Sequence, residues 1–138
     1  MKKILLPGLV SGLVMVIVSI VVSQVLSVLF PSVMAEYQNS GIFRPWTDPK
    51  MSIMFLHPFM LGVILAYIWD KTKSVVKGNS HVMKGLTFGF IYWLLTIPGM
   101  VMSYSSFPIS MLMVDTWIIS IFIQSICGAI ILVLMNKA

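Results

Sequence analysis

The sequence predicts an all-α membrane protein, a single domain (residues 1–138) in which four transmembrane helices form a bundle. Composition is the first reason: 59% of the 138 residues are hydrophobic and 9% are charged, too few charged side chains to coat a water-soluble core. The second reason is four apolar stretches, each long enough to cross a bilayer's hydrocarbon core. They cover residues of about 4–30, 51–69, 84–104 and 111–135, with an outer loop at 31–50 and a cytoplasmic loop at 70–83.

The first stretch is long for one crossing, so we expect it to tilt or to extend beyond the membrane. A cleaved signal peptide is the alternative, because Lys2 and Lys3 precede the stretch and Val33-Met34-Ala35 resembles a cleavage site. The apolar run is far longer than the central region of a signal peptide, however. We therefore predict an uncleaved helix that ends before Pro31.

The third stretch has one face formed by small and weakly polar side chains. They recur every three or four positions, the spacing that places residues on one side of a helix. They are Gly85, Gly89, Tyr92, Thr96, Gly99 and Ser103. In lipid such a face lets two backbones approach closely, and its hydroxyl groups can hydrogen-bond to a neighbouring helix.

The other three stretches carry related patterns. The first has Gly8, Gly12, Met15, Ser19, Ser23 and Ser27 at helical spacing, the second has Gly62 and Ala66, and the fourth has Ser120, Gln124 and Gly128. One G-x-x-x-G pair is a weak signal, but two in matching positions favour close helix packing. The glycines expected in helix contacts are Gly8, Gly12, Gly62, Gly85, Gly89, Gly99 and Gly128.

Prolines predict breaks in this regular pattern. We expect His57-Pro58 to interrupt the second stretch and Pro98-Gly99 to kink the third. Two further prolines, Pro45 and Pro49, keep the outer loop out of regular helix.

The net charge of +5 reflects membrane topology rather than nucleic-acid binding. Seven of the nine basic residues, all lysines, fall at helix ends that share one side, whereas Arg44 and Lys50 fall on the other. By the positive-inside rule, both termini are cytoplasmic in a multi-pass protein of the cell (inner) membrane. The lysines then contact anionic membrane lipids, and no nucleic-acid partner is expected.

The two halves of the chain resemble each other. Each half has a G-x-x-x-G helix, then an outer link with an aspartate, then a return helix whose glycine precedes a lysine by nine residues. Two parallel hairpin repeats would place the first and third helices in equivalent positions. The alternative is coincidence, because such hairpins commonly share glycine and terminal lysine.

Several polar side chains are candidates for a ligand site near the outer helix ends or in the membrane. They are Glu36, Arg44, Asp48, His57, Thr96, Tyr104, Asp115 and Gln124. His57 is the one ionisable side chain well inside a stretch, which suggests function, although we favour a neutral histidine bonded to a neighbouring hydroxyl or to the outer loop. Asp115 is explained by helix capping. An aromatic belt accounts for Tyr37, Trp46, Tyr104 and Trp117.

Most catalytic chemistries lack the residues they need. Cys127 is the single cysteine, which rules out an intrachain disulfide or a thiol pair. His57 and His81 fall on opposite sides of the membrane, so they do not form a haem or metal site. We therefore expect no cofactor, no metal and no enzyme activity.

Three functions remain as hypotheses. The first is a non-enzymatic membrane protein that binds a lipid, a small apolar ligand or a partner membrane protein, or another copy of itself, through glycine-rich helix faces. The alternative is an oligomeric transporter or channel whose path is lined by Gln24, His57, Thr96 and Gln124. The second alternative is an intramembrane enzyme, which would need His57 and Asp115 within hydrogen-bond distance.

Overall fold

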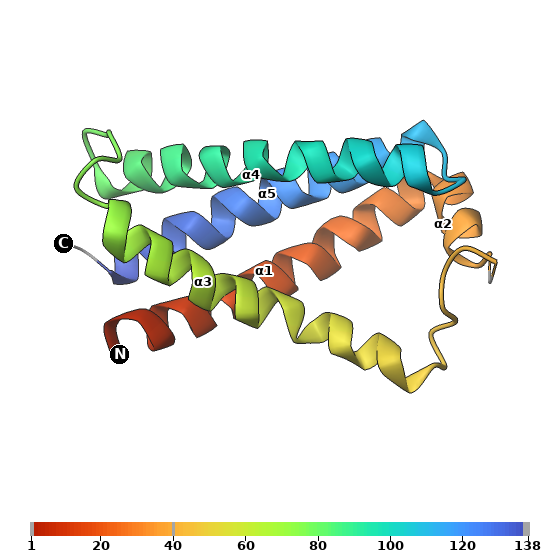
Figure 1. Cartoon of the computed structure of the whole chain (residues 1–138), viewed down its shortest axis with the longest axis horizontal. Coiled ribbons are helices and arrows are strands. Elements are labelled where there is room, and N and C mark those ends of the chain that lie inside the picture. The colour runs from red at the N-terminus through yellow and green to blue at the C-terminus, as the bar shows by residue number, and fades with distance from the viewer. Residues whose placement is uncertain (1, 40, 137–138) are drawn as a thin grey trace.

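The structure is a computed structural model that describes residues 2–39 and 41–136, and these residues are entirely helical or irregular. The elements are α1 (Lys2–Leu29), α2 (Pro31–Tyr37), the 3₁₀ helix η1 (Pro49–Phe55), α3 (His57–Thr72), α4 (His81–Ser106) and α5 (Met111–Met135) (Figure 1). Four segments are long and apolar enough to cross a membrane: Lys3–Leu29, Pro49–Thr72, His81–Ser106 and Met111–Met135.

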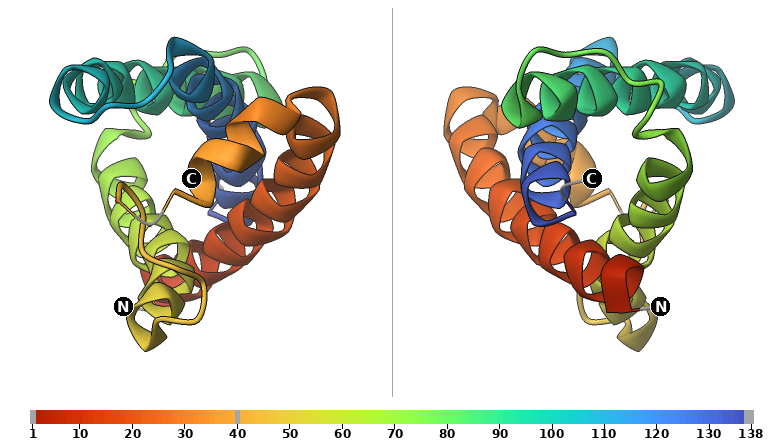
Figure 2. Two further views of the ribbon diagram at one scale, coloured as in Figure 1. Left: turned by 90° about the vertical axis from the view of Figure 1, so that its right-hand side faces the viewer. Right: turned by 90° about the vertical axis from the view of Figure 1, so that its left-hand side faces the viewer.

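The long helices are arranged around α1 and α5. Helix α1 packs against both α3 and α5, and α4 packs against α5, as the end-on views of Figure 2 show. Helix α1 begins, α5 ends and α3 connects to α4 at one end of the molecule, which we call the lysine-rich end (Figure 1). The opposite end holds residues 30–39 and 41–56 and the α4–α5 connection, and we call it the loop end.

Local sequence sets where the elements begin. Ser80 and Ser110 cap α4 and α5: each hydroxyl accepts a hydrogen bond, 3.1 Å long, from the amide of Met83 or Met113. Prolines occupy the first turns of α2, η1 and α3, where a missing N–H costs nothing.

Glycines set the contact between α1 and α3. A methyl group added at Gly12 would lie 2.7 Å from the Pro58 carbonyl oxygen, and one at Gly8 would lie 2.6 Å from the Val63 Cα. A methyl at Gly62 would overlap the Gly8 carbonyl. The two backbones therefore touch directly at this crossing, as small residues permit.

Glycines also lie in the contacts of α5 with α4 and with α1. Methyl groups at Gly85 and Gly89 would lie 2.8 Å from the Ile130 Cα and 2.7 Å from the Ser125 carbonyl oxygen. Gly128 faces α1, where the buried Ser11 hydroxyl donates a 2.9 Å hydrogen bond to its carbonyl. This bond joins the two hairpins of the chain.

Gly99 departs from the prediction. A methyl group there would meet no other group within 4 Å, and the residue is exposed. The reason is that the contact face of α4 turns as it follows α5: Trp93 donates a 3.0 Å hydrogen bond to the Ile118 carbonyl, and Met100 is buried. Beyond Trp93 the contact thus passes to Met100, and Gly99 lies on the open side.

Of the two prolines expected to disturb the long helices, Pro98 does not, whereas the second stretch is interrupted directly before His57-Pro58. Helix α4 is continuous through Pro98 and runs without a visible kink in Figure 1. In the second stretch the break lies at Leu56, between the 3₁₀ helix η1 and α3, one residue before His57-Pro58. Helix α2 within the outer loop was not predicted, because a seven-residue helix after Pro31 carries too little periodicity to be recognised.

The contacts do not follow the expected two-fold repeat. In each hairpin the G-x-x-x-G pair faces the return helix, α3 for the first pair and α5 for the second. The return helices differ, however, because Gly62 faces its own hairpin partner whereas Gly128 faces α1 of the other hairpin. Helix α1 therefore packs extensively against two long helices, α3 and α5, whereas its proposed equivalent, α4, packs extensively against α5 alone.

Buried apolar side chains form two separate clusters. At the lysine-rich end they are Met15, Leu65, Ala66, Trp69, Phe88, Ala129, Leu132 and Val133. At the loop end they are Val33, Met100, Ile109, Met113 and Val114. None of these buried side chains lines the open cavity that lies between α1, α5, α2 and the η1–α3 junction.

Candidate functional site

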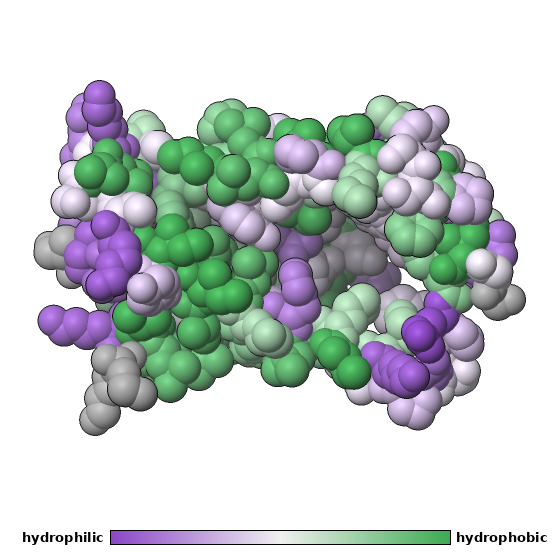
Figure 3. Space-filling view, in the orientation of Figure 1, coloured by the Kyte–Doolittle hydropathy of each residue, from purple (hydrophilic) through white to green (hydrophobic). Residues whose placement is uncertain are grey.

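An open cavity of about 330 Å³ lies between α1, α5, α2 and the η1–α3 junction. Its wall mixes apolar and polar side chains: Val16, Ser19, Ser23, Met34, Tyr37, Trp46, Met54, Phe55, His57, Pro58, Ser120 and Gln124. Figure 3 shows the molecule hollowed toward its loop end, beside a mainly hydrophobic midsection. We call this feature the loop-end cavity.

The cavity exists because two helices diverge. Helices α1 and α3 touch at Gly8, Gly12 and Gly62, all nearer the lysine-rich end. From that crossing they separate toward the loop end, as Figure 1 shows. Backbone contact near the lysine-rich end thus leaves a wedge-shaped space between α1 and α3 at the loop end. Helix α2, Trp46 and η1 enclose this space only partly.

Three polar groups on the wall are free to contact a ligand. The Gln124 side-chain amide donates a 2.9 Å hydrogen bond to the Ser120 hydroxyl, and the Ser19 hydroxyl donates one of 2.8 Å to the Val16 carbonyl. By contrast, the His57 ring, the Ser23 hydroxyl and the Gln124 amide oxygen have no hydrogen-bond partner among the described residues. Together they offer donors and an acceptor within an apolar wall.

Helix α2 forms one side of the cavity and is fixed to α5 by two polar contacts. The Trp117 indole N–H donates to the Tyr37 hydroxyl, and the Ser110 amide donates a 2.9 Å hydrogen bond to the Glu36 carboxylate. Burial raises the pKa of Tyr37 above its ordinary value, so the phenol stays protonated at neutral pH. Glu36 thereby helps to cap α5 instead of facing the cavity.

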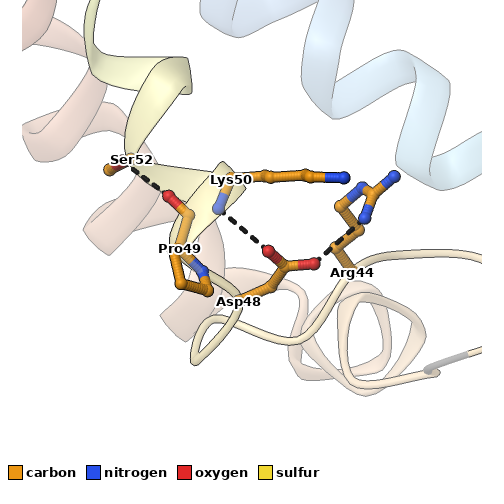
Figure 4. Close-up of polar contacts among 5 residues, drawn as sticks. All are labelled: Arg44, Asp48, Pro49, Lys50 and Ser52. Carbon is orange, nitrogen blue, oxygen red and sulfur yellow. Dashed lines mark hydrogen bonds and ion pairs between the residues drawn. The ribbon is translucent and has the colours of Figure 1, made fainter.

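A short polar turn holds the other side of the cavity in place. The Asp48 carboxylate accepts hydrogen bonds from the Lys50 amide, 2.9 Å, and from the Arg44 guanidinium, 3.0 Å (Figure 4). These bonds hold the pKa of Asp48 below its ordinary value. The bond from the Lys50 amide contributes most, and the bond from Arg44 contributes next. The turn fixes the stretch that contains Trp46, which lines the cavity.

The predicted site residues do not converge as a set. His57 and Gln124 line the cavity. Arg44 and Asp48 bond to each other in the turn, Glu36 caps α5, and the Thr96 hydroxyl donates to the Trp93 carbonyl of its own helix. Tyr104 is exposed on α4. Of the candidate ligand residues, His57 and Gln124 thus share the loop-end cavity, and the others lie elsewhere.

His57 and Asp115 are not brought together. Asp115 is exposed, does not line the cavity and lies nine residues before Gln124, which places the two about 180° apart on α5. The pair that an intramembrane enzyme would need is absent among the described residues.

Three of the cavity's polar residues were predicted for other roles. Ser19 and Ser23 belong to the small-residue stripe of α1, and Ser120 to that of α5, and these stripes were expected to be packing faces. Tyr37 and Trp46 were expected in an aromatic belt. The stripe of α1 changes from glycine to serine along the helix, and this change could have indicated the cavity. Glycine allows close helix contact, whereas serine can line a polar cavity.

No metal-binding arrangement is present in the described part of the chain, where no three His, Cys, Asp or Glu side chains gather. Cys127 is a free, half-buried thiol in α5. Comparison with known protein families, curated proteins and solved structures finds no match to this chain.

Proposed function

We propose that the protein is a multi-pass membrane protein that binds a small amphipathic molecule, such as a single-chain lipid, in the loop-end cavity. The single observation that carries the proposal is the mixed wall of the 330 Å³ cavity, in which unbonded polar groups stand among apolar side chains. The volume lies near the lower end of typical ligand pockets, which favours one acyl chain over a diacyl lipid. No chemical step is required, so the proposed role is non-enzymatic.

The membrane assignment is supported by the outer surface of the helices. Large apolar side chains there are widely exposed, for example Val28 at 78%, Leu95 at 75% and Met102 at 69%. In water such a surface would drive aggregation, whereas acyl chains cover it without cost. With the lysine-rich end in the cytoplasm, the cell (inner) membrane would hold both termini inside and the cavity in the outer half.

The glycine-rich faces are not proposed as the binding surface. Six of the seven glycines lie against other helices of the same chain, so these faces are already covered. A partner protein or a second copy of the chain would have to use other surfaces.

A transporter or channel is less well supported. Two of its four expected path residues, His57 and Gln124, line the cavity. The other two do not, since Gln24 is exposed on α1 and Thr96 bonds within α4. The cavity is thus better described as a binding pocket than as part of a path.

Single cysteines test the topology. In a Cys127→Ala background, Asn39→Cys and Asn79→Cys are expected to react with a membrane-impermeant maleimide from opposite sides of the membrane, because these exposed residues lie at opposite ends of the molecule. Asn79→Cys is expected to react only after the cytoplasmic side is opened. Labelling of both positions in intact cells would contradict the membrane topology.

Filling the cavity tests ligand binding. Val16 lines it, whereas the adjacent Ile17 is 54% exposed. With diazirine-labelled palmitate in liposomes, Val16→Phe should reduce crosslinking to cavity peptides at least about fivefold, because the added ring occupies the space of the chain. Ile17→Phe, the matched control, should leave crosslinking unchanged. Equal crosslinking in both variants, or crosslinks spread evenly over exposed helix faces, would contradict the pocket.

A further inference from the structure

A second hollow lies at the lysine-rich end, between α3 and α4. It encloses about 420 Å³ and shares no residue with the loop-end cavity; its lining consists of Ile68, Thr72, Val75, Val76, Lys77, Thr87, Phe88 and Ile91. We call it the α3–α4 groove. All but three of these residues are apolar.

The groove exists because α3 and α4 each pack on a different central helix. Helix α3 packs against α1 and α4 against α5, and α3 meets α4 where the tilted rings of Trp69 and Phe88 contact each other, with their centres 5.3 Å apart. Phe88 is 5% exposed and forms the floor, whereas Val75 at 72% and Ile91 at 46% form open edges. An apolar groove open at the side has the shape that an acyl chain fills.

Positive charge gathers at the mouth of the groove. Lys77 lines it, and the backbone at Gly78 folds against Lys84, so that a methyl at Gly78 would lie 2.7 Å from the Lys84 amide nitrogen. Asp70, the acidic residue of this end, pairs with Lys73 at 3.0 Å. No carboxylate among the described residues forms an ion pair with Lys77 or Lys84, so their charge is available to an anion.

Neither threonine hydroxyl of the groove is free to donate a hydrogen bond to an anion. The Thr72 hydroxyl donates a 2.8 Å hydrogen bond to the Ile68 carbonyl, and the Thr87 hydroxyl donates one of 3.0 Å to the Met83 carbonyl. Recognition of a headgroup therefore depends on the lysines.

We propose that the α3–α4 groove binds an anionic phospholipid of the cytoplasmic leaflet, with one acyl chain against Phe88 and the headgroup phosphate between Lys77 and Lys84. Basic pockets between helices on the cytoplasmic side are sites of this kind. The inference rests on the proposed membrane insertion and topology but not on a ligand in the loop-end cavity.

Native mass spectrometry of the full chain, purified in detergent with added phosphatidylglycerol or phosphatidylcholine, tests the charge requirement. Wild type should retain phosphatidylglycerol preferentially. Lys77→Gln and Lys84→Gln should each weaken phosphatidylglycerol retention by about fivefold, because a lysine contributes on this order to anionic lipid binding. Lys71→Gln is the matched control: it removes the same charge at the same end, but Lys71 lies over the Tyr67 ring, 5.7 Å from its centre, and does not line the groove.

The shape of the groove is tested by a second pair of variants. Thr87→Phe should narrow the groove and reduce retention of phosphatidylglycerol at least about fivefold, whereas Leu86→Phe, at the adjacent residue outside the groove, should not. Equal retention of both lipids by wild type, or equal effects of Lys71→Gln and Lys77→Gln, would overturn the site. Failure of the cysteine-labelling test would overturn the proposed topology, and palmitate crosslinking reports on the loop-end cavity, so the three results are separable.

Discussion

Gly62→Leu is expected to unfold the α1–α3 contact and to lower stability more than any other single glycine substitution in the chain. Its added side chain would enter the backbone of α1 at Gly8 and Gly12, and neither glycine has a side chain that can move aside. Overpacking a tight contact costs about 1–3 kcal/mol when side chains can adjust. Here the helices themselves must separate, so we expect a loss of at least about 3 kcal/mol in the free energy of unfolding.

The chain supplies a matched control for this prediction. Gly99→Leu places the same side chain in the middle of a long helix, but at a position with nothing within 4 Å, and it should change stability little. Titration with SDS in mixed micelles would measure both variants, and Gly89→Leu should lie between them, because its added side chain meets the Ser125 carbonyl less closely than that of Gly62→Leu meets Gly8. Similar stabilities for Gly62→Leu and Gly99→Leu would show that the α1–α3 crossing is not formed by backbone contact.

The contrast between these glycines shows what the sequence could predict. Gly8, Gly12, Gly85 and Gly89 were recognisable because two small residues four apart leave a notch on one helix face. Gly99 shares that face by spacing alone. Spacing does not say how far along its length a helix stays beside its partner, and here Trp93 and Met100 take over the contact.

The site was harder to predict than the helices for a related reason. His57 and Gln124 are distant in sequence. Whether they line the same cavity depends on how widely α1 and α3 diverge from the glycine crossing. No local pattern encodes that divergence. The position of Asp115 was foreseeable, because nine residues of helix place it opposite Gln124.

The expected repeat illustrates the same limit at the level of the whole fold. Similar motifs in the two hairpins produce similar contacts inside each hairpin, since those contacts are local in sequence. How the hairpins then pack depends on particular residues, such as the hydrogen bond from Ser11 to the Gly128 carbonyl. The corresponding position in the other hairpin, Gly62, already contacts α1 of its own hairpin, so the arrangement is asymmetric.

Trp69→Ala is the second substitution expected to have a large effect. Trp69 is 2% exposed, packs against the Phe88 ring and donates a 3.2 Å hydrogen bond from its indole to the Asn136 carbonyl, so one side chain links α3 to α4 and to the end of α5. Removing a buried tryptophan costs about 3–5 kcal/mol in soluble proteins. We expect about 3 kcal/mol, because part of the apolar gain is already available from lipid when the helices separate.

Two further variants separate the contributions of packing and hydrogen bonding. Trp69→Phe keeps most of the packing and loses the hydrogen bond, so it should cost about 1 kcal/mol. Trp46→Ala, at a residue that is 63% exposed, removes the same atoms from the loop end and should cost less than either. A Trp69→Ala protein as stable as Trp46→Ala would mean that the apolar cluster at the lysine-rich end does not depend on Trp69 to hold the two hairpins together.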